Sequence, residues 1–538
     1  MDSKLGVMLD CSRNAVMSVS ALKRFIQLIA KMGYNRLLLY TEDTYEIKGE
    51  PLFGYLRGRY SGEEIKEIDR FCISLGVELV PCIQTLAHLN QIFSWNKYSK
   101  INDINDILLV DEEKTYELIE KMFATCAENF TCRKIHIGMD EAHKLGLGKY
   151  LDRNGFVNRS QLFLKHLNKV CELADKYGFK PMMWSDMFFS LAFGKYYVFD
   201  DEQVPEDVKK LVPDNIELVY WDYYSNNEEQ YLSMLEKHLS FNRDISFAGG
   251  AWKWEMFTPL NATSIPRNEN AIRACNKLGV KDIMITLWGD NGFECPAYAV
   301  LPTLVHAAEC AKGNYGLDNA KQKFLQIVGV PWDDFMLFDM YLPDSIPKSF
   351  PKANGIKTMF YNDCLAGRYD SSVIGDGSEG KAIAEIGKQI ALAKKHAGRF
   401  AYLFDHFAKL AEFMEIKYDL GYRSRTVYKN GNKKQLKNLI KDFGLAIKRL
   451  NAFYEAFKVT WYMDNKAFGF EVTDIRLGGL KQRLIHAREI LLDYLKGKID
   501  KIEELETELV EFDDIAEVNK KVPYAFPYSK TSSACRIL

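Results

Sequence analysis

Short apolar runs alternate with amphipathic stretches over roughly the first 310 residues of the chain. Most of the runs are near-continuous in apolar residues, which is typical of strands buried on both faces. This pattern predicts eight strands, at residues 5–10, 36–42, 77–84, 134–141, 180–187, 216–224, 245–252 and 282–290.

Amphipathic helices are predicted between these strands. Residues 18–33, 61–76 and 160–178 carry apolar side chains at three- and four-residue spacing, and each stretch begins at serine and ends at glycine. Eight strands that alternate with helices over roughly 300 residues predict an α/β fold, the (β/α)8 TIM barrel. The alternative, an open doubly wound sheet, is disfavoured because no glycine-rich phosphate loop follows the first strand.

The pattern changes to long helical stretches with apolar stripes after about residue 315, at residues 380–416, 433–463 and 477–509. We therefore predict a barrel domain at residues 1–315 and an all-α C-terminal domain at residues 316–538. The helical domain either packs on the barrel or forms a homodimer, and its charged positions are expected to be solvated faces. The tail after residue 522 is expected to be poorly structured.

Composition excludes several classes of function. The chain has 538 residues and a net charge of -2, so neither nucleic acid nor an anionic membrane is an expected partner. Its 11 cysteines show no CxxC pair, which favours a reducing compartment over a disulfide framework. No signal peptide and no apolar run of about 18 residues is evident, so we expect a cytoplasmic protein.

Polar and aromatic residues gather where the predicted strands end, and the C-terminal ends of barrel strands carry the active site in this fold. Five of the eight tryptophans fall at the ends of the last four strands. Aromatic rings that stack on sugar rings, together with carboxylates and arginine that bind hydroxyls, predict a carbohydrate site. The alternative is that some of these tryptophans only fill the mouth of the barrel. The residues at the strand ends are Asp10, Arg13, Glu42, Asp43, Gln84, His88, Asp140, Glu141, Trp184, Asp186, Trp221, Asp222, Tyr223, Trp252, Trp254, Trp288 and Asp290.

Two adjacent acids, Asp140 and Glu141, follow the fourth strand in "KIHIGMDEAH". A standard glycosidase places two carboxyl groups on opposite sides of the scissile bond, at least about 5 Å apart. Neighbours on a strand point to opposite faces and suit that task badly. Their adjacency favours a substrate-assisted reaction, in which a 2-acetamido group attacks C1 and forms an oxazolinium ion. The shorter Asp140 would then hold the acetamide, and Glu141 would transfer the proton.

The motif "HIGMDEAH" resembles the catalytic motif of glycoside hydrolase family 20, the β-N-acetylhexosaminidases. The segments "MLDCSR", "YTEDTYEIKGEP", "IQTLAHL", "WSDM", "VYWDYY" and "LWGDNGFE" match the same family in the same order. The resemblance covers the whole barrel and implies removal of terminal non-reducing GlcNAc or GalNAc with retention, without a metal or an organic cofactor. The small domain that precedes the barrel in many relatives is not expected here.

The resemblance also implies roles for individual residues. Asp140 would orient the acetamide, Glu141 would be the general acid and then the base, and a raised pKa is expected for Glu141. Tyr223, chosen over Tyr220, would donate to the acetamide oxygen, because this chain has "AWKWE" where better-known relatives carry the tyrosine on strand 7. The other implied substrate-binding residues are Arg13 for the 3- and 4-hydroxyls, Trp184, Trp252 and Trp288 around the acetamide methyl, Trp221 as a further candidate, Asp290 for the 4- or 6-hydroxyl, and His88 and His143 beside the carboxylates or the 6-hydroxyl.

Several alternatives stay open. His136 is expected to be a core histidine rather than a metal ligand, and Arg13 is either a sugar ligand or an ion-pair partner of Asp10. Glu42 and Asp43 belong either to the site or to the loop that follows the second strand. For the whole protein, the alternatives are a lacto-N-biosidase, a 6-sulfo-GlcNAc hydrolase, or a non-catalytic sugar-binding barrel.

Overall fold

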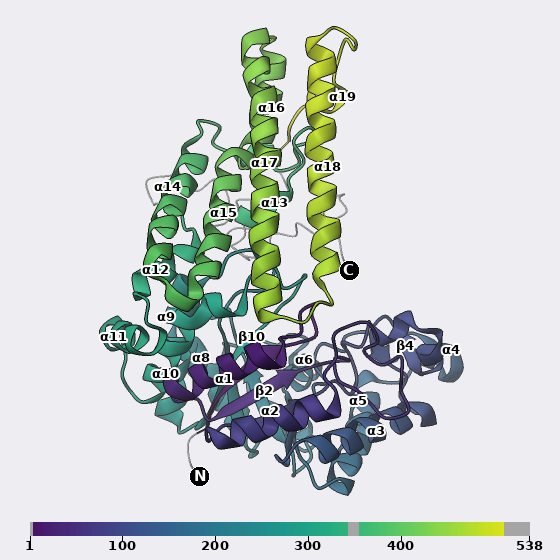
Figure 1. Cartoon of the computed structure of the whole chain (residues 1–538). Helices are drawn as coiled ribbons and strands as arrows, with labels where there is room; N and C mark the ends of the chain where they lie inside the picture. The colour runs from purple at the N-terminus through teal and green to yellow at the C-terminus, as the bar shows by residue number, and fades with distance from the viewer. Residues whose placement is uncertain (1–3, 343–354, 511–538) are drawn as a thin grey trace. The chain divides into compact units, whose positions relative to one another are not determined.

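The computed structural model describes residues 4–342 and 355–510, and Figure 1 shows the chain with its helices and strands labelled. The tail after residue 522 lies outside these described ranges. The chain divides into two compact units that interleave along the sequence. The first unit comprises Met1–Trp252, Asn261–Trp288 and Leu301–Ile327, and the second comprises Lys253–Leu260, Gly289–Val300 and Val328–Leu538.

Eight parallel strands form a closed barrel in the first unit, in the order β1-β10-β9-β8-β7-β6-β3-β2. The predicted TIM barrel is confirmed. Some strands end earlier than predicted, and β6 stops four residues before Asp140. The barrel strands are β1 (Lys4–Asp10), β2 (Arg36–Tyr40), β3 (Glu78–Cys82), β6 (Lys134–His136), β7 (Lys180–Trp184), β8 (Glu217–Trp221), β9 (Ile245–Gly250) and β10 (Asp282–Leu287). A separate antiparallel pair joins β4 (Asn102–Ile104) to β5 (Ile107–Leu108).

Helices connect the strands, and their ends follow the sequence signals. The Ser18 hydroxyl accepts the amide of Ala21 at the start of α1 (Val19–Met32), which ends at Gly33 with φ 105°. Ser61 and Glu64 form a capping box on α2 (Gly62–Ser74). The remaining α-helices of this part are α3 (Glu113–Asn129), α4 (Lys149–Asn154), α5 (Arg159–Lys176), α6 (Asp186–Phe193), α7 (Glu206–Lys209), α8 (Glu228–Leu239), α9 (Asn261–Leu278), α10 (Leu301–Ala311) and α11 (Leu317–Val328).

Ion pairs link the N-terminal ends of the barrel strands. Arg36 at the start of β2 donates to Asp282 of β10 at 2.7 Å and to Glu78 of β3 at 3.0 Å. Lys134 of β6 pairs with Glu217 of β8 and with Asp282. All five charged residues hold strands together, so this end of the barrel is structural, and the chemistry is expected at the opposite end.

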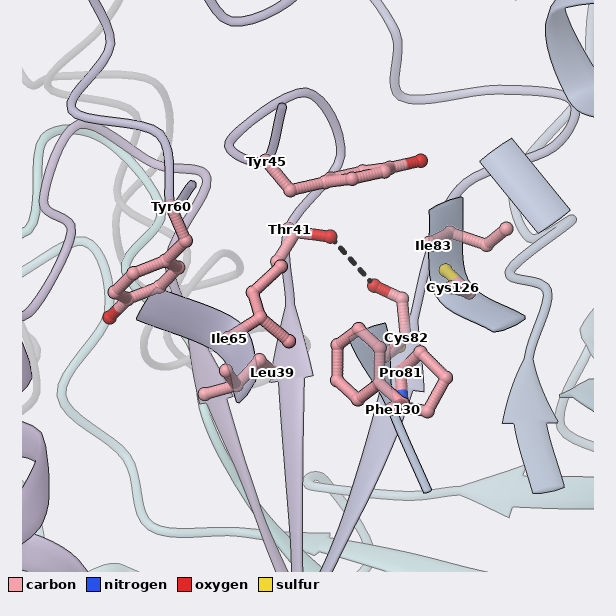
Figure 2. A pocket seen from close by; sticks show the side chains of 10 residues that line it. All are labelled: Leu39, Thr41, Tyr45, Tyr60, Ile65, Pro81, Cys82, Ile83, Cys126 and Phe130. Atoms are coloured by element: carbon pink, nitrogen blue, oxygen red, sulfur yellow. Dashed lines mark hydrogen bonds between the residues drawn. The ribbon is translucent and has the colours of Figure 1, made fainter. Parts of the chain in front are cut away.

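A small cavity lies beside the outward faces of β2 and β3, and Figure 2 shows its lining. Leu39 and Pro81 contribute from these two strands, and Ile65 contributes from α2. The Thr41 hydroxyl donates to the Cys82 carbonyl at 3.1 Å across the two strands (Figure 2). None of the predicted site residues lines this mostly apolar cavity, so we assign it to imperfect packing and not to substrate binding.

The second unit is helical in its described residues, as predicted for the C-terminal region. Helix α14 packs on α15, α15 on α17, and α17 on α18, and Figure 1 shows α17 and α18 as two long helices side by side. The helices are α12 (Trp332–Met336), α13 (Gly355–Tyr361), α14 (Ser378–Ala393), α15 (Ala401–Lys417), α16 (Leu420–Lys429), α17 (Lys433–Asp464), α18 (Phe470–Leu495) and α19 (Glu503–Glu506).

A fully buried ion cluster ties three segments of the second unit together. Glu294 pairs with Lys357 of α13 at 2.5 Å and with Arg476 of α18 at 2.7 Å, and the Tyr361 hydroxyl donates to it at 2.7 Å. Burial favours the protonated form of Glu294, but the two cations outweigh it and hold the pKa of this carboxyl below its usual value. The cluster therefore fixes the segment at Gly289–Val300 against two helices of the same unit.

Within the described ranges, no helix is both long enough and apolar enough to cross a membrane. The ten cysteines in the described ranges are all free and buried.

Candidate active site

The loop after β6 brings the two adjacent acids to one imidazole. Gly138 and Met139, with φ of 70°, and Glu141, with φ of 51°, adopt the left-handed conformation. The Nε2 atom of His88 lies 3.1 Å from Asp140 Oδ2 and 3.7 Å from Glu141 Oε2. The expectation that these acids diverge like strand neighbours is wrong, because the strand has ended and the left-handed turns redirect the backbone.

Asp140 is held as an anion by its neighbours. Burial favours the neutral acid, but the charge of His88 and a 2.9 Å hydrogen bond from Gln84 Nε2 outweigh it and lower the pKa of Asp140 to about 2. Burial likewise favours neutral His88, but the Asp140 carboxylate raises the pKa of His88 to about 10. The pair is therefore ionised throughout the neutral range.

Gln84 links Asp140 to the second strand and to the loop. Its Nε2 also donates to the Tyr40 hydroxyl at 3.0 Å, and its Oε1 accepts the Met139 amide at 3.2 Å. A Cβ atom on Gly138 would lie 2.0 Å from Gln84 Oε1. Only glycine fits at this position, because the side chain of Gln84 fills the space that any other residue would need.

Gly138→Ala is expected to weaken both the fold and the hold on Asp140. The positive φ alone costs about 1–2 kcal/mol of unfolding free energy, and displacement of Gln84 adds to that cost. Gly178→Ala is the matched control, since Gly178 has φ 72° and no neighbour within 4 Å of the added Cβ. Denaturant titration and kcat of both variants measure the effect. An activity loss no greater in Gly138→Ala than in Gly178→Ala would contradict the role given to Gln84.

Glu141 is fixed through its backbone and leaves its side chain accessible. Its side chain is 50% exposed, whereas that of Asp140 is 14% exposed. The Glu141 amide donates to Asp186 Oδ2 at 3.0 Å. Asp186 is the first residue of α6 and is buried. Burial, with the charge of Asp140 next, raises the pKa of Asp186 to about 8, so this carboxyl is neutral at pH 7.

Asp186→Asn is expected to stabilise the protein at pH 7. Because the folded pKa exceeds the unfolded value of 3.8, the folded state binds more protons between about pH 4 and pH 8, and wild-type stability falls as pH rises through that window. Asparagine keeps the acceptor for the Glu141 amide and removes this titration. Denaturant midpoints at pH 5 and pH 7.5 should show a gain that is larger at pH 7.5.

Asp175→Asn, at an exposed position, serves as the control for the loss of one acidic residue. A gain for Asp186→Asn that is equal at both pH values would contradict a buried neutral acid.

Arg13 joins the acids to the aromatic side chains. Its Nη1 donates to Asp10 Oδ2 at 3.2 Å, and its Nε lies 3.6 Å from Glu42 Oε1. The guanidinium carbon is 4.8 Å from the Tyr40 ring centre and 5.1 Å from that of Trp288. The pairing with Asp10 is present, but Arg13 also adjoins the predicted sugar site.

The two acids after the second strand have different surroundings. Burial raises the pKa of Glu42 to about 7, although the charges of Arg13 and His88 oppose this rise. The contact with Arg13 places Glu42 beside the predicted site. Asp43 instead pairs with Arg57 at 3.2 Å and holds the loop.

Four of the predicted aromatic residues form one connected set. Trp184 and Trp288 have ring centres 6.0 Å apart, and Trp288 Nε1 donates to the Tyr223 hydroxyl at 2.9 Å. Trp221 stacks on Tyr223 at 5.5 Å. Tyr220 is engaged elsewhere, because its hydroxyl donates to Asp222 at 2.6 Å. Trp252 adjoins this set through Tyr224, at 5.7 Å.

The other predicted residues have different surroundings. Asp290 and Trp254 belong to the second unit, and the role predicted for Asp290 stays a prediction. His143 is exposed. His136 is buried and accepts the Gly138 amide at Nδ1, at 3.1 Å, and burial lowers its pKa to about 3. It has the surroundings of a neutral core histidine.

Tyr40 contributes a contact to Gln84 that the prediction missed, whereas Gln84 and Asp186 were predicted at strand ends without an individual role. Tyr40 ends β2, Gln84 lies two residues beyond β3, and Asp186 lies two residues beyond β7. The signal that finds them is their place at strand ends, combined with a polar atom in an otherwise apolar segment.

His88, Asp140 and Glu141 lie close enough together to share a metal ion. A metal ion there would have to displace the proton that the pairing with Asp140 keeps on Nε2 of His88. A second group of such side chains comprises Glu269 on α9 and His306 and Cys310 on α10.

Two family models match the chain. The model of the glycosyl hydrolase family 20 catalytic domain matches residues 5–240, and that of the Glycoside Hydrolase 20C C-terminal domain matches residues 333–523. The chain belongs to glycoside hydrolase family 20. Both parts of the molecule therefore have counterparts in this family.

Named relatives are distant. Human Hexosaminidase D is 26% identical over 224 residues, which are 39% of this chain and 43% of the human protein. Bovine Hexosaminidase D is 24% identical over 266 residues, 47% of this chain and 71% of that protein. The chain thus spans less than half the length of its human relative.

Solved structures with a similar fold include two from bacteria. The family 20 β-N-acetylhexosaminidase of Streptomyces coelicolor A3(2) has a TM-score of 0.44 and 18% identity, over 60% of this chain and 69% of that one. The exo-β-N-acetylglucosaminidase of Vibrio harveyi has a TM-score of 0.46 and 16% identity, over 61% and 58%.

Proposed function

We propose that the protein is a retaining exo-β-N-acetylhexosaminidase that uses the acetamido group of its substrate as the nucleophile. One observation carries this proposal: a partly buried carboxylate, Asp140, and a half-exposed one, Glu141, adjoin the same His88. Two carboxyl groups that adjoin one imidazole are badly placed to attack and protonate from opposite sides of one sugar carbon. This arrangement favours an attacking atom that comes from the substrate.

Asp140 serves the acetamide. Its pKa of about 2 keeps it charged, and the hydrogen bond from Gln84 and the ion pair with His88 fix its direction. One carboxylate oxygen accepts the acetamide N–H and turns the carbonyl oxygen toward C1. As that oxygen attacks, positive charge develops on nitrogen, and the fixed anion stabilises it without reorganisation.

Glu141 transfers the proton. Its exposed carboxyl protonates the glycosidic oxygen as the bond to C1 breaks, and its carboxylate then takes a proton from the water that opens the oxazolinium ring. The bond from its amide to Asp186 holds the left-handed turn that keeps this side chain beside Asp140. His88 lies within reach of both carboxylates and carries the balancing charge.

The sugar ring would be held by the surrounding side chains. Trp184 and Trp288 wall the acetamide methyl, with Trp221 and Trp252 beside them, and Tyr223 donates to the acetamide oxygen. The support for Tyr223 is its contact with Trp288, while Tyr220 is bonded to Asp222. Arg13 binds the 3- and 4-hydroxyls, and Asp290 binds the 4- or 6-hydroxyl.

The test offers nitrophenyl β-GlcNAc, β-GalNAc and β-glucoside to the purified protein. Cleavage of the two acetamido sugars with the β-anomer as first product, and little cleavage of the glucoside, is expected. Comparable cleavage of the glucoside would overturn the substrate-assisted mechanism. No cleavage of any of the three would favour a non-catalytic sugar-binding barrel, and cleavage of a disaccharide or 6-sulfated glycoside alone would favour a lacto-N-biosidase or a 6-sulfo-GlcNAc hydrolase.

We further infer that the protein works in a reducing compartment, the cytoplasm. The support is the set of ten free, buried cysteines, which an oxidising compartment would expose to disulfide formation during folding. Cell fractionation tests the location, and sedimentation of the full chain tests the predicted homodimer.

A further inference from the structure

A row of aromatic side chains continues from the predicted sugar site to the surface of the first unit. Tyr223 stacks on Trp221 with ring centres 5.5 Å apart, and the Trp221 ring centre lies 5.9 Å from that of Tyr197. The Tyr197 and Phe199 rings are nearly parallel, at 18°, with centres 6.0 Å apart. Exposure increases along the row, from 8% for Tyr223 to 42% for Phe199. The row therefore begins among the predicted acetamide ligands and ends in solvent.

The outer part of the row lies in the connection between β7 and β8, and hydrogen bonds hold this segment in place. The Tyr197 hydroxyl donates to the Trp221 carbonyl at 3.4 Å. Lys237 of α8 donates to the Asp200 carbonyl at 2.7 Å, directly after Phe199 in the chain. These bonds lie on both sides of Phe199 and fix its backbone, so the exposed ring is positioned before any ligand binds.

The same connection contains the residue that fixes the proposed general acid. Asp186 accepts the Glu141 amide at 3.0 Å. Burial raises the pKa of Asp186, and a contact from Trp221 opposes this rise, so Trp221 also faces that carboxyl. A general acid stands beside the departing oxygen, so the sugar beyond the scissile bond lies on the Glu141 side of the site. The row therefore starts on the side from which the leaving group departs.

Rings arranged in this way suit a glycan chain, because the apolar C–H faces of successive sugars pack on successive rings. The ring centres follow one another at 5.5, 5.9 and 6.0 Å, close to the repeat of one β-linked sugar in an extended glycan. Beside Phe199 in the chain, the half-exposed Lys195 and Asp200 pair at 3.4 Å and offer a donor and an acceptor to sugar hydroxyls. An aromatic cluster that only filled the interior would bury its last ring, whereas the last ring here is exposed.

We propose that Tyr197 and Phe199 bind the two sugars on the reducing side of the terminal N-acetylhexosamine, so that the enzyme prefers chains of three or more sugars. Trp221 adjoins the terminal sugar, Tyr197 takes the second sugar and Phe199 takes the third. This assignment rests on the proposed hydrolysis and adds a preference for chain length. Contacts so far from C1 are equally strong in the bound substrate and in the transition state, so they lower KM and leave kcat unchanged.

Initial rates of release of the terminal sugar from glycans of increasing length test the subsite. The probes are nitrophenyl β-GlcNAc, the β1,4-linked di- and trisaccharides of GlcNAc, and GlcNAcβ1-3Galβ1-4Glc with its disaccharide GlcNAcβ1-3Gal. For at least one linkage, wild type should cleave the trisaccharide with a kcat/KM about 3- to 10-fold above that of the disaccharide, the range for one aromatic contact. Phe199→Ala should remove this advantage by raising KM for the trisaccharide, with changes of less than about twofold on the shorter substrates. Phe156→Ala, which removes a 78% exposed ring outside the row, should keep the advantage.

Two further variants keep the test decisive if Phe199→Ala is unstable. Phe199→Trp retains a flat ring and should retain the preference for trisaccharides, whereas Phe199→Leu is apolar without a flat ring and should lose most of it. Equal kcat/KM for di- and trisaccharides of both linkages in wild type would overturn the subsite. A Phe199→Ala defect of the same size on every substrate, nitrophenyl β-GlcNAc included, would also overturn it.

Failure of the proposed function has a different signature, the absence of cleavage of nitrophenyl β-GlcNAc by wild type. Calorimetric titration with the same trisaccharides then measures the subsite without hydrolysis. Wild type should bind at least one trisaccharide more tightly than its disaccharide, and Phe199→Ala should bind the two equally. Equal affinities in wild type would overturn the subsite in that case as well.

Discussion

Replacement of Asp140 by asparagine is expected to lower kcat by about 10²- to 10³-fold on nitrophenyl β-GlcNAc, the size of loss seen when one fixed transition-state contact is removed. The native carboxylate is held by His88 and Gln84, so its charge is in place before the substrate reacts. Asparagine has nearly the same shape but carries no charge, and its amide can face the acetamide with an N–H where an acceptor is needed. The loss should fall on kcat more than on KM, because the positive charge on nitrogen develops only as the ring closes.

Two measurements separate this effect from a damaged fold. The Tm of Asp140→Asn should fall, because the fold favours the charged form of Asp140 and the variant leaves the protonated His88 without its partner, but the variant should remain folded at the assay temperature. A thiazoline that mimics the cyclised sugar should bind the variant much more weakly, while a simple sugar such as GlcNAc should lose little affinity. An equal loss for both ligands, or an unchanged kcat, would contradict the role of Asp140.

The barrel could be predicted from the sequence because each strand is buried on both faces and each helix has a distinct start and stop. The strand at residues 5–10 and the helix at residues 18–33 illustrate this, since their observed limits, Lys4–Asp10 and Val19–Met32, differ by about a residue. Local signals suffice for such elements. They also place Arg13, His88 and Trp288 in the segments that follow strands.

The details of the site depend on contacts that no local pattern encodes. The strand predicted at 134–141 ends at His136, because Gly138, Met139 and Glu141 adopt positive φ values that only the bonds to Gln84 and Asp186 explain. A methionine and a glutamate in that conformation are uncommon, so sequence alone favours a longer strand.

The sequence pattern also did not predict that the two units interleave along the chain. Residues 253–260 and 289–300 follow barrel strands but cluster with the helical unit. What distinguishes the second segment is the buried charge of Glu294, whose partners Lys357 and Arg476 come from helices far along the chain.

Glu141→Gln is expected to lower kcat by about 10²- to 10⁴-fold on substrates with a poor leaving group, the usual contribution of a general acid. The size of the loss should depend on the leaving group. A dinitrophenolate departs without a proton, so the first step on dinitrophenyl β-GlcNAc should be nearly unaffected, whereas methylumbelliferyl and alkyl glycosides need the proton and should suffer most. Glutamine is close in shape, and the half-exposed side chain has room for it.

The matched comparison is a plot of rate against the pKa of the leaving group for wild type, Glu141→Gln and Asp140→Asn. Glu141→Gln should steepen the slope, because charge then builds on the departing oxygen. Asp140→Asn should shift the line down and keep its slope, because attack by the acetamide is impaired whatever departs. The same slope for both variants would contradict the separate roles, in which Asp140 holds the acetamide and Glu141 donates the proton.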